Sequence, residues 1–111
     1  MASMAQPAQH PHIPDDIALA DYLLSKYTQS ARTWESELHE CGENWCVQQA
    51  IWHADQQCAV LRVCRDTIIA DPVGGSSQTE RLVVRIIARE FVDREDFADH
   101  WRELVELAME Y

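Results

Sequence analysis

The sequence predicts an all-α protein, a compact bundle of four or five helices that ends in a helical hairpin. Apolar residues recur at steps of three and four along most of the chain, the period of a helix packed on one side. Three glycines and four prolines are present, and they lie mainly at the ends of the periodic stretches. A single core commonly fills 111 residues. We therefore expect one helical domain over residues 13–111, preceded by a mobile tail over residues 1–12.

The first predicted helix ends before Gly42, a typical helix stop. Pro14 suits a first helical turn, and Asp15 and Asp16 follow where the helix dipole favours acidic side chains. The apolar positions of this stretch form one face, and this stripe is expected to be core: Ile13, Ile17, Ala20, Leu24, Tyr27, Ala31, Trp34 and Leu38.

The middle of the chain is less regular. Residues 43–54 fit a short helix and an irregular packed segment equally well. Asp55 is a candidate N-cap for a following helix. The apolar stripe of that helix is Val60, Leu61, Cys64 and Ile68. The segment 71–75, which contains one proline and two glycines, ends it.

The last third predicts two helices, over residues 78–91 and 94–111. Ser77 and Glu80 have the spacing of a capping box, which marks the start of the first. Its expected inward residues are Leu82, Val83, Ile86, Ile87 and Phe91. Its β-branched residues also permit a strand over residues 82–87, so both readings stay open. Asp93 is the expected cap of the final helix, whose expected inward residues are Phe97, Trp101, Leu104, Val105 and Ala108.

The formal net charge of −10 excludes several classes of partner. Phosphate backbones and anionic lipids repel such a chain, so we expect no direct nucleic-acid binding and no membrane association. No apolar run reaches the length of a membrane span, and the N-terminus lacks the regions of a signal peptide. Without a secretory signal, the four cysteines are expected to be reduced thiols, which predicts a cytoplasmic protein.

Thiols and imidazoles are the strongest candidates for chemistry. Zinc and iron–sulfur sites favour ligand pairs two residues apart, and the spacing here is wider. The candidate ligands are His39, Cys41, Cys46, His53, Cys58 and Cys64. We expect structural thiols and no cofactor, with a thiol-ligated metal or cluster sensor as an alternative. No signature of nucleophilic catalysis surrounds any cysteine, and Gly74-Gly75 lacks the lysine of a phosphate-binding loop. A non-enzymatic protein is therefore indicated.

Four tryptophans are many for so small a core, and tryptophan commonly anchors protein interfaces. Trp101 is expected in the core and Trp52 at least partly exposed. A second candidate surface is the acidic outer row of the final helix, formed by Glu95, Asp99, Glu103, Glu106 and Glu110. Arg94 and Arg102 interrupt this row, which favours a solvated face over a charged binding site.

The segment 82–102, LVVRIIAREFVDREDFADHWR, resembles the C-terminal signature of a family of small uncharacterised helical proteins of actinobacteria and their phages. The matching positions are Ala88, Phe91, Asp93, Asp96, Phe97, Trp101 and Arg102. Arg94 and Glu95 stand where the family has His-Pro, so no role of that histidine is carried over. The resemblance extends more weakly over the first and middle helices. It implies a helical fold and an actinobacterial or actinophage source, and it supplies no activity.

Protein binding is the function that these observations predict. An acidic exterior, spare tryptophans and the lack of a catalytic constellation favour a module that engages a host protein or a second copy of itself, so a homo-oligomer is compatible with the prediction. The phage or mobile-element origin rests on the resemblance alone. The alternative is an acidic mimic of nucleic acid that blocks a DNA- or RNA-binding protein.

Overall fold

A computed structural model describes residues 12–41, 45–71 and 73–109, without the side chains of residues 39–41. Nearly all of the expected tail, the glycine stop at position 42 and Glu110 lie outside this description. The described residues form the four α-helices α1, α2, α3 and α4 and a short 3-10 helix, η2, and they contain no strand. The all-α prediction is confirmed.

The helices α1 (Ile13–Cys41) and α2 (Trp45–Ile69) are long and pack side by side. Their buried residues recur at helical steps because each helix turns one apolar face to the other. In α1 these are Ile13, Leu19, Ala20, Leu23, Tyr27 and Ala31, and in α2 they are Val47, Ala54, Cys58, Leu61, Cys64 and Ile68. The first predicted helix is confirmed.

The expected break before Asp55 is wrong. Asp55 is an exposed residue in the interior of α2, which runs without interruption from Trp45. Residues 45–69 contain neither glycine nor proline, so nothing in the backbone interrupts the helix. Val47 and Ala54 also lie on the same buried face as Leu61, which extends the packed stripe through the supposed break.

Residues 82–87 are helical, within α3 (Gln78–Ile87), which continues into η2 (Ala88–Phe91). The inward face differs from the predicted one: Arg81, Val84, Arg85 and Ala88 are buried, whereas Ile86 is exposed. Arg81 and Arg85 occupy the inward-facing side of α3, where the apolar pattern predicted Ile86 and Ile87. Leu82, Val83 and Ile87 are half-buried, and Phe91 is buried as predicted.

The predicted capping box does not form. Ser77 occupies the N-cap position of α3, but its side chain makes no capping hydrogen bond. Its Oγ instead accepts a hydrogen bond from Arg81 Nε at 3.3 Å, and its backbone N–H donates to Asp71 Oδ2 at 2.7 Å. Asp71 therefore accepts the hydrogen bond from the Ser77 backbone N–H that a capping box assigns to Glu80.

The last helix, α4, covers Asp99–Met109 and begins five residues later than predicted. Residues 92–98 form turns, and Phe97 N–H donates to Arg94 O at 3.1 Å. Asp93 is therefore not the cap of α4. The predicted inward residues Phe97, Leu104, Val105 and Ala108 are buried, and Trp101 is half-buried against the core.

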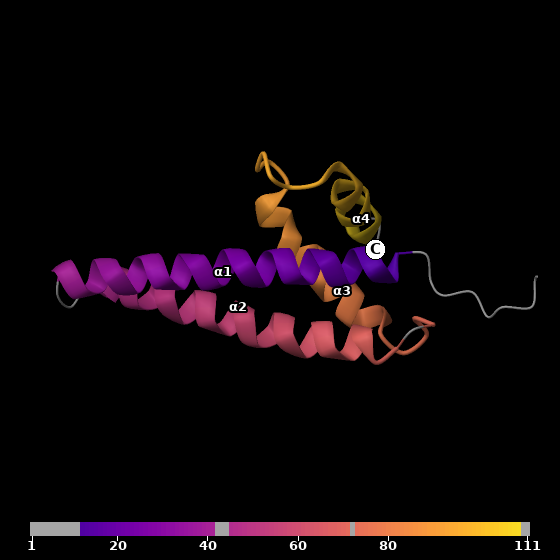
Figure 1. The fold of residues 1–111 in the computed structure, drawn as a ribbon, viewed down its shortest axis with the longest axis horizontal. Coiled ribbons are helices and arrows are strands. Elements are labelled where there is room, and N and C mark those ends of the chain that lie inside the picture. The colour runs from indigo at the N-terminus through magenta and orange to yellow at the C-terminus, as the bar shows by residue number, and fades with distance from the viewer. Residues whose placement is uncertain (1–11, 42–44, 72, 110–111) are drawn as a thin grey trace, which may run out of the picture.

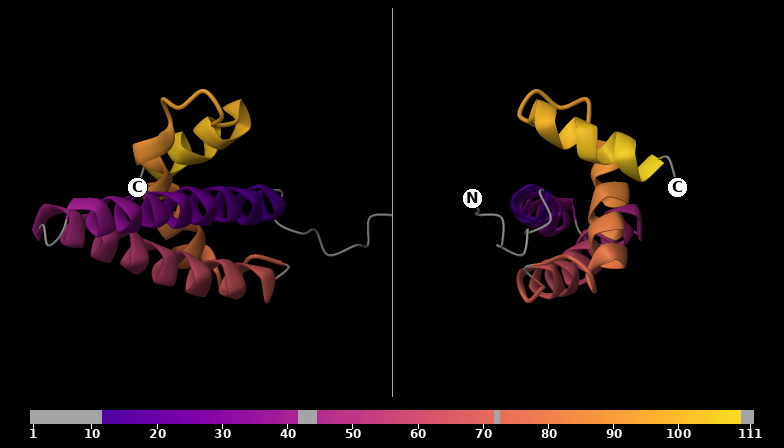
Figure 2. Two further views of the ribbon diagram at one scale, coloured as in Figure 1. Left: turned by 60° about the vertical axis from the view of Figure 1, so that its left-hand side comes forward. Right: turned by 90° about the vertical axis from the view of Figure 1, so that its right-hand side faces the viewer.

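The helices α2, α3 and α4 all pack against α1. In Figure 1, α2 lies along one side of α1, α4 lies on the other side, and α3 crosses behind to connect them. Figure 2 shows the same arrangement from two further directions. The end of α1 near residue 41 and the start of α2 extend beyond α3 and α4 as a two-helix arm. None of the described helices combines the length and apolar character needed to cross a membrane.

Candidate protein-binding surface

The helix α2 carries a second row of residues on the side opposite its buried face. The row recurs at alternating steps of four and three, so its members share one helical face: Trp45, Gln49, Trp52, Gln56, Ala59 and Val63. We call this row the outer face of α2. All six residues are exposed, and the exposed fractions of Trp45, Trp52 and Val63 are 71%, 58% and 65%.

No charged residue occurs in this row between Trp45 and Val63, in a chain with 25% charged residues and a net charge of −10, and the next position of the series is the exposed Asp66. The four charged residues of the whole helix, Asp55, Arg62, Arg65 and Asp66, cancel in formal charge. Figure 1 shows α2 along the edge of the molecule, with no other helix on the side away from α1. An uncharged face with two exposed tryptophans is typical of a protein-binding site.

The predicted exposure of Trp52 is confirmed. Trp45 lies on the same face of α2 as Trp52, which was not predicted. Trp45, Trp52 and Ala59 are spaced seven residues apart. In one continuous helix this spacing predicts that they lie on the same face.

The acidic row of the final helix is only partly assembled. Asp99, Glu103 and Glu106 are exposed on α4, but Glu95 lies in the turns before the helix. Asp99 forms an ion pair with Arg102, so part of the row is neutralised. Within the described residues, the uncompensated acids of α4 are Glu103 and Glu106.

The residues behind the family resemblance form an aromatic cluster. Phe91 and Phe97 are buried, and Tyr22 of α1 lies between them, with ring centroids 6.1 and 5.6 Å away. Trp101 packs on both Tyr22 and Phe97, at 5.0 and 5.4 Å. The cluster therefore includes Tyr22, which lies outside the segment 82–102.

Two tyrosines of α1 tie this cluster to acidic residues near the α3–α4 connection. Tyr22 Oη donates to Asp96 Oδ1 at 2.7 Å, and Tyr27 Oη donates to Glu90 Oε2 at 3.0 Å. Burial, followed by these hydrogen bonds, raises the pKa of both tyrosines to about 12. Lys26 forms an ion pair with Asp96, and it and the Tyr22 hydroxyl lower the pKa of that carboxyl. These contacts fasten the α3–α4 turns to α1.

The described thiols do not assemble into a metal site. Cys46 is exposed, and Cys58 and Cys64 are buried. Burial, with the negative charge of Glu80, raises the pKa of the Cys64 thiol and lowers its reactivity. Among the residues that the structure describes, no three histidine, cysteine or acidic side chains lie together as metal ligands do. The side chains of His39 and Cys41 lie outside that description.

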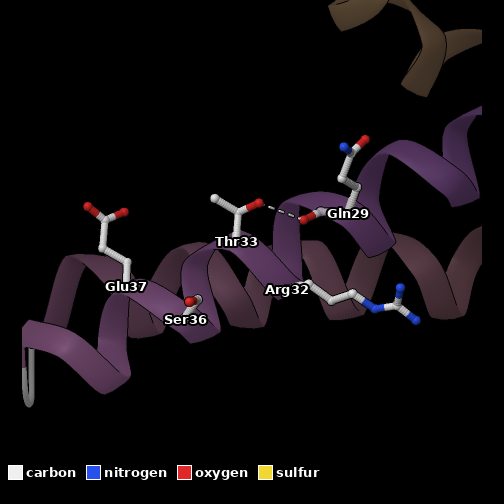
Figure 3. Close-up of a pocket in the computed structure, with 5 residues that line it drawn as sticks. All are labelled: Gln29, Arg32, Thr33, Ser36 and Glu37. Atoms are coloured by element: carbon white, nitrogen blue, oxygen red, sulfur yellow. Dashed lines mark hydrogen bonds between the residues drawn. The ribbon is translucent and has the colours of Figure 1, made fainter.

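Two of the surface hollows are open and lined mainly by polar side chains. One is bounded by a single stretch of α1 and is shown in Figure 3, where the Thr33 hydroxyl donates to the Gln29 carbonyl at 3.0 Å within the helix. Another lies between α1 and α2 and is lined by Arg32 and Glu35 of α1 and by Asp55, Cys58 and Arg62 of α2. The Cys58 thiol lies 3.7 Å from the Thr28 hydroxyl in this hollow.

Comparison of the chain with protein-family models, with curated proteins and with solved structures finds no match.

Proposed function

We propose that this protein is a non-enzymatic protein-binding module that contacts its partner with the outer face of α2. The observation that carries the proposal is the alignment of Trp45, Trp52 and Val63, all well exposed, on a face without charge. Exposed tryptophans are costly to leave in water and are common energetic centres of interfaces. Few surfaces of such an acidic chain are able to approach another acidic protein.

The arrangement of the helix supports this role. The buried face of α2 already supplies the contacts with α1 and α3. The exposed tryptophans of the outer face are therefore not required for that packing. Partner binding accounts for their presence on this face. The family resemblance favours a phage or mobile-element protein, whose partner is a host protein or a second copy of itself.

Affinity capture with matched variants tests the proposal. Trp52→Ala should weaken partner binding by about 30-fold, the loss expected for an interface residue worth about 2 kcal/mol. Ile86→Ala is the control, because it removes a comparably exposed apolar side chain from α3. Equal binding by the wild type and both variants would contradict the proposal.

A second candidate is the acidic mimic of nucleic acid, which the exposed pair Glu103 and Glu106 on α4 favours. Such a protein places carboxylates where a basic partner expects phosphates, so its binding weakens steeply with salt. Glu103→Gln with Glu106→Gln separates the two candidates, because it removes charge from α4 and leaves the outer face of α2 intact.

A further inference from the structure

Two charged residues border the outer face of α2 on the same side. Asp55 and Arg62 are seven residues apart, which is two helical turns, and both are exposed. Neither forms an ion pair within the described part of the chain. A second helix that presents the same two residues in the opposite order places an opposite charge against each of them.

A second copy of α2 running antiparallel supplies that order. In a twofold pairing, residue i of one chain meets residue j of the other, and j meets i. A twofold axis beside Ala59 sets Asp55 of each copy against Arg62 of the other. Flanking residues on the same side of two antiparallel helices face each other, so two reciprocal ion pairs border the contact.

The sizes of the side chains fit the same axis. Ala59 is the smallest residue of the outer face and lies at the centre, where the two helices approach most closely. Gln56 of each copy is then opposite Val63 of the other. Trp52 lies two turns from the axis, where crossing helices diverge and a large side chain fills the wider space. There it is opposite Asp66 of the second copy, whose carboxylate accepts hydrogen bonds from an indole N–H.

The charge distribution favours self-association through this helix. Two copies that each carry a net charge of −10 repel each other at most surfaces. The charges of α2 cancel, so this repulsion is weak there. We propose that the partner of the outer face of α2 is a second copy of this chain, in an antiparallel homodimer with its axis beside Ala59. This inference rests on the proposed function, because it names the partner of the same face.

Charge reversal at the two flanking positions is the decisive experiment. Asp55→Arg leaves both flanking residues basic, and Arg62→Asp leaves both acidic. Each variant alone should be monomeric by sedimentation velocity under conditions in which the wild type is dimeric. An equimolar mixture of the two variants should form dimers with one copy of each, seen by native mass spectrometry, because every cross-pair is then acid against base.

Matched controls carry the same charge changes elsewhere. Glu103→Arg on α4 and Arg89→Asp after α3 alter exposed residues away from the outer face of α2, and both should remain dimeric. Circular dichroism of all variants should show unchanged helix content. Loss of the dimer in the controls, or no heterodimer on mixing, would overturn the pairing that we propose.

The failure of this inference is distinct from the failure of the proposed function. A wild type that stays monomeric up to about 1 mM, the weak end of the affinity range for specific complexes, overturns the homodimer. If the wild type is monomeric but captures a different protein, and Trp52→Ala abolishes that capture, the outer face of α2 is the binding site and the captured protein is its partner. A wild-type dimer that Trp52→Ala dissociates supports the inference.

Discussion

Arg85 and Asp16 are 69 positions apart in the chain and form a bidentate ion pair in the interior of the protein. Arg85 donates from Nε to Asp16 Oδ1 and from Nη2 to Oδ2, at 2.8 Å each. Asp16 is fully buried and Arg85 nearly so. The pair fixes α3 against the first turn of α1, at the end of the molecule opposite the two-helix arm.

Removing one partner of this pair should destabilise the fold strongly. Asp16→Ala leaves the Arg85 charge buried without its carboxylate, and we expect a loss of about 3–5 kcal/mol in the free energy of unfolding. Urea denaturation followed by circular dichroism measures the change. Asp15→Ala is the control, since Asp15 is adjacent but only half-buried, with His100 Nε2 3.6 Å from its carboxylate. The double variant Asp16→Leu with Arg85→Met should recover much of the loss. Equal stability of the two single variants would contradict the assignment.

Asp71 should make stability depend on pH in the acidic range. Its carboxylate accepts backbone hydrogen bonds from Gly74, Ser76 and Ser77, at 3.1, 2.8 and 2.7 Å. Burial raises the pKa of Asp71, but the hydrogen bonds from Ser76 and Ser77 outweigh it, so the pKa lies below its ordinary value. A lowered folded pKa stabilises the protein above the unfolded value of about 3.9, and this contribution disappears as pH falls toward the folded pKa.

Asp71→Asn tests that dependence. The amide retains an acceptor oxygen and loses the charge, so the variant should unfold more easily at neutral pH. The difference in unfolding free energy between variant and wild type should narrow below about pH 4, where the Asp71 carboxyl of the unfolded chain takes up a proton before that of the folded protein does. Denaturation midpoints measured across this range decide the matter, and a gap that stays constant with pH would refute the role of the charge.

Trp101 and Trp52 should differ sharply in their contribution to stability. Trp101 packs on Tyr22 and Phe97, so Trp101→Ala should cost about 3–5 kcal/mol, the usual loss for a large core aromatic. Its Nε1 is buried and has no hydrogen-bond partner among the described residues. Trp101→Phe should therefore cost much less, because it removes an unsatisfied donor and keeps an aromatic ring. Trp52→Ala should leave the melting temperature nearly unchanged. Equal losses for Trp52→Ala and Trp101→Ala would exclude the distinction.

The parts of the fold that follow from apolar spacing could be predicted from the sequence. Ile13, Ala20, Tyr27 and Ala31 of the predicted α1 stripe are buried, and so are Leu104, Val105 and Ala108 of α4. Ile17, Leu24, Trp34, Leu38 and Trp101 are only half-buried, and the fully buried Leu19 and Leu23 were not predicted. The continuity of α2 was missed because this helix is apolar on two opposite faces. Trp45 and Trp52 on one side and Val47 and Ala54 on the other blur the period that marks a one-sided helix.

Buried charges account for most of the remaining differences. Arg81 and Arg85 take inward positions of α3 because Gly74 O, at 2.7 Å from Arg81, and the Asp16 carboxylate satisfy them. Asp16 is 69 positions from Arg85, and Gly74 lies in the turn before α3, so the helical spacing of α3 identifies neither partner. The candidate site was half predicted for a different reason: Trp52 was expected to be exposed, but its neighbours on the outer face are recognised only when residues 45–69 form one helix.

The acidic residues of α4 should contribute little to partner binding. Arg102 neutralises Asp99, and Glu95 lies outside the helix, so Glu103 and Glu106 do not continue a row of charge. Glu103→Gln with Glu106→Gln should leave partner affinity unchanged, or slightly tighter if the partner is itself acidic, because it lowers the net negative charge. Raising the salt concentration should have an equally small effect, since exposed charges are already screened over about 10 Å at 0.1 M salt. Calorimetric titration at low and high salt, with the wild type and the double variant, measures both. About tenfold weakening in both comparisons would instead establish the acidic face of α4 as the binding site and the protein as a mimic of nucleic acid.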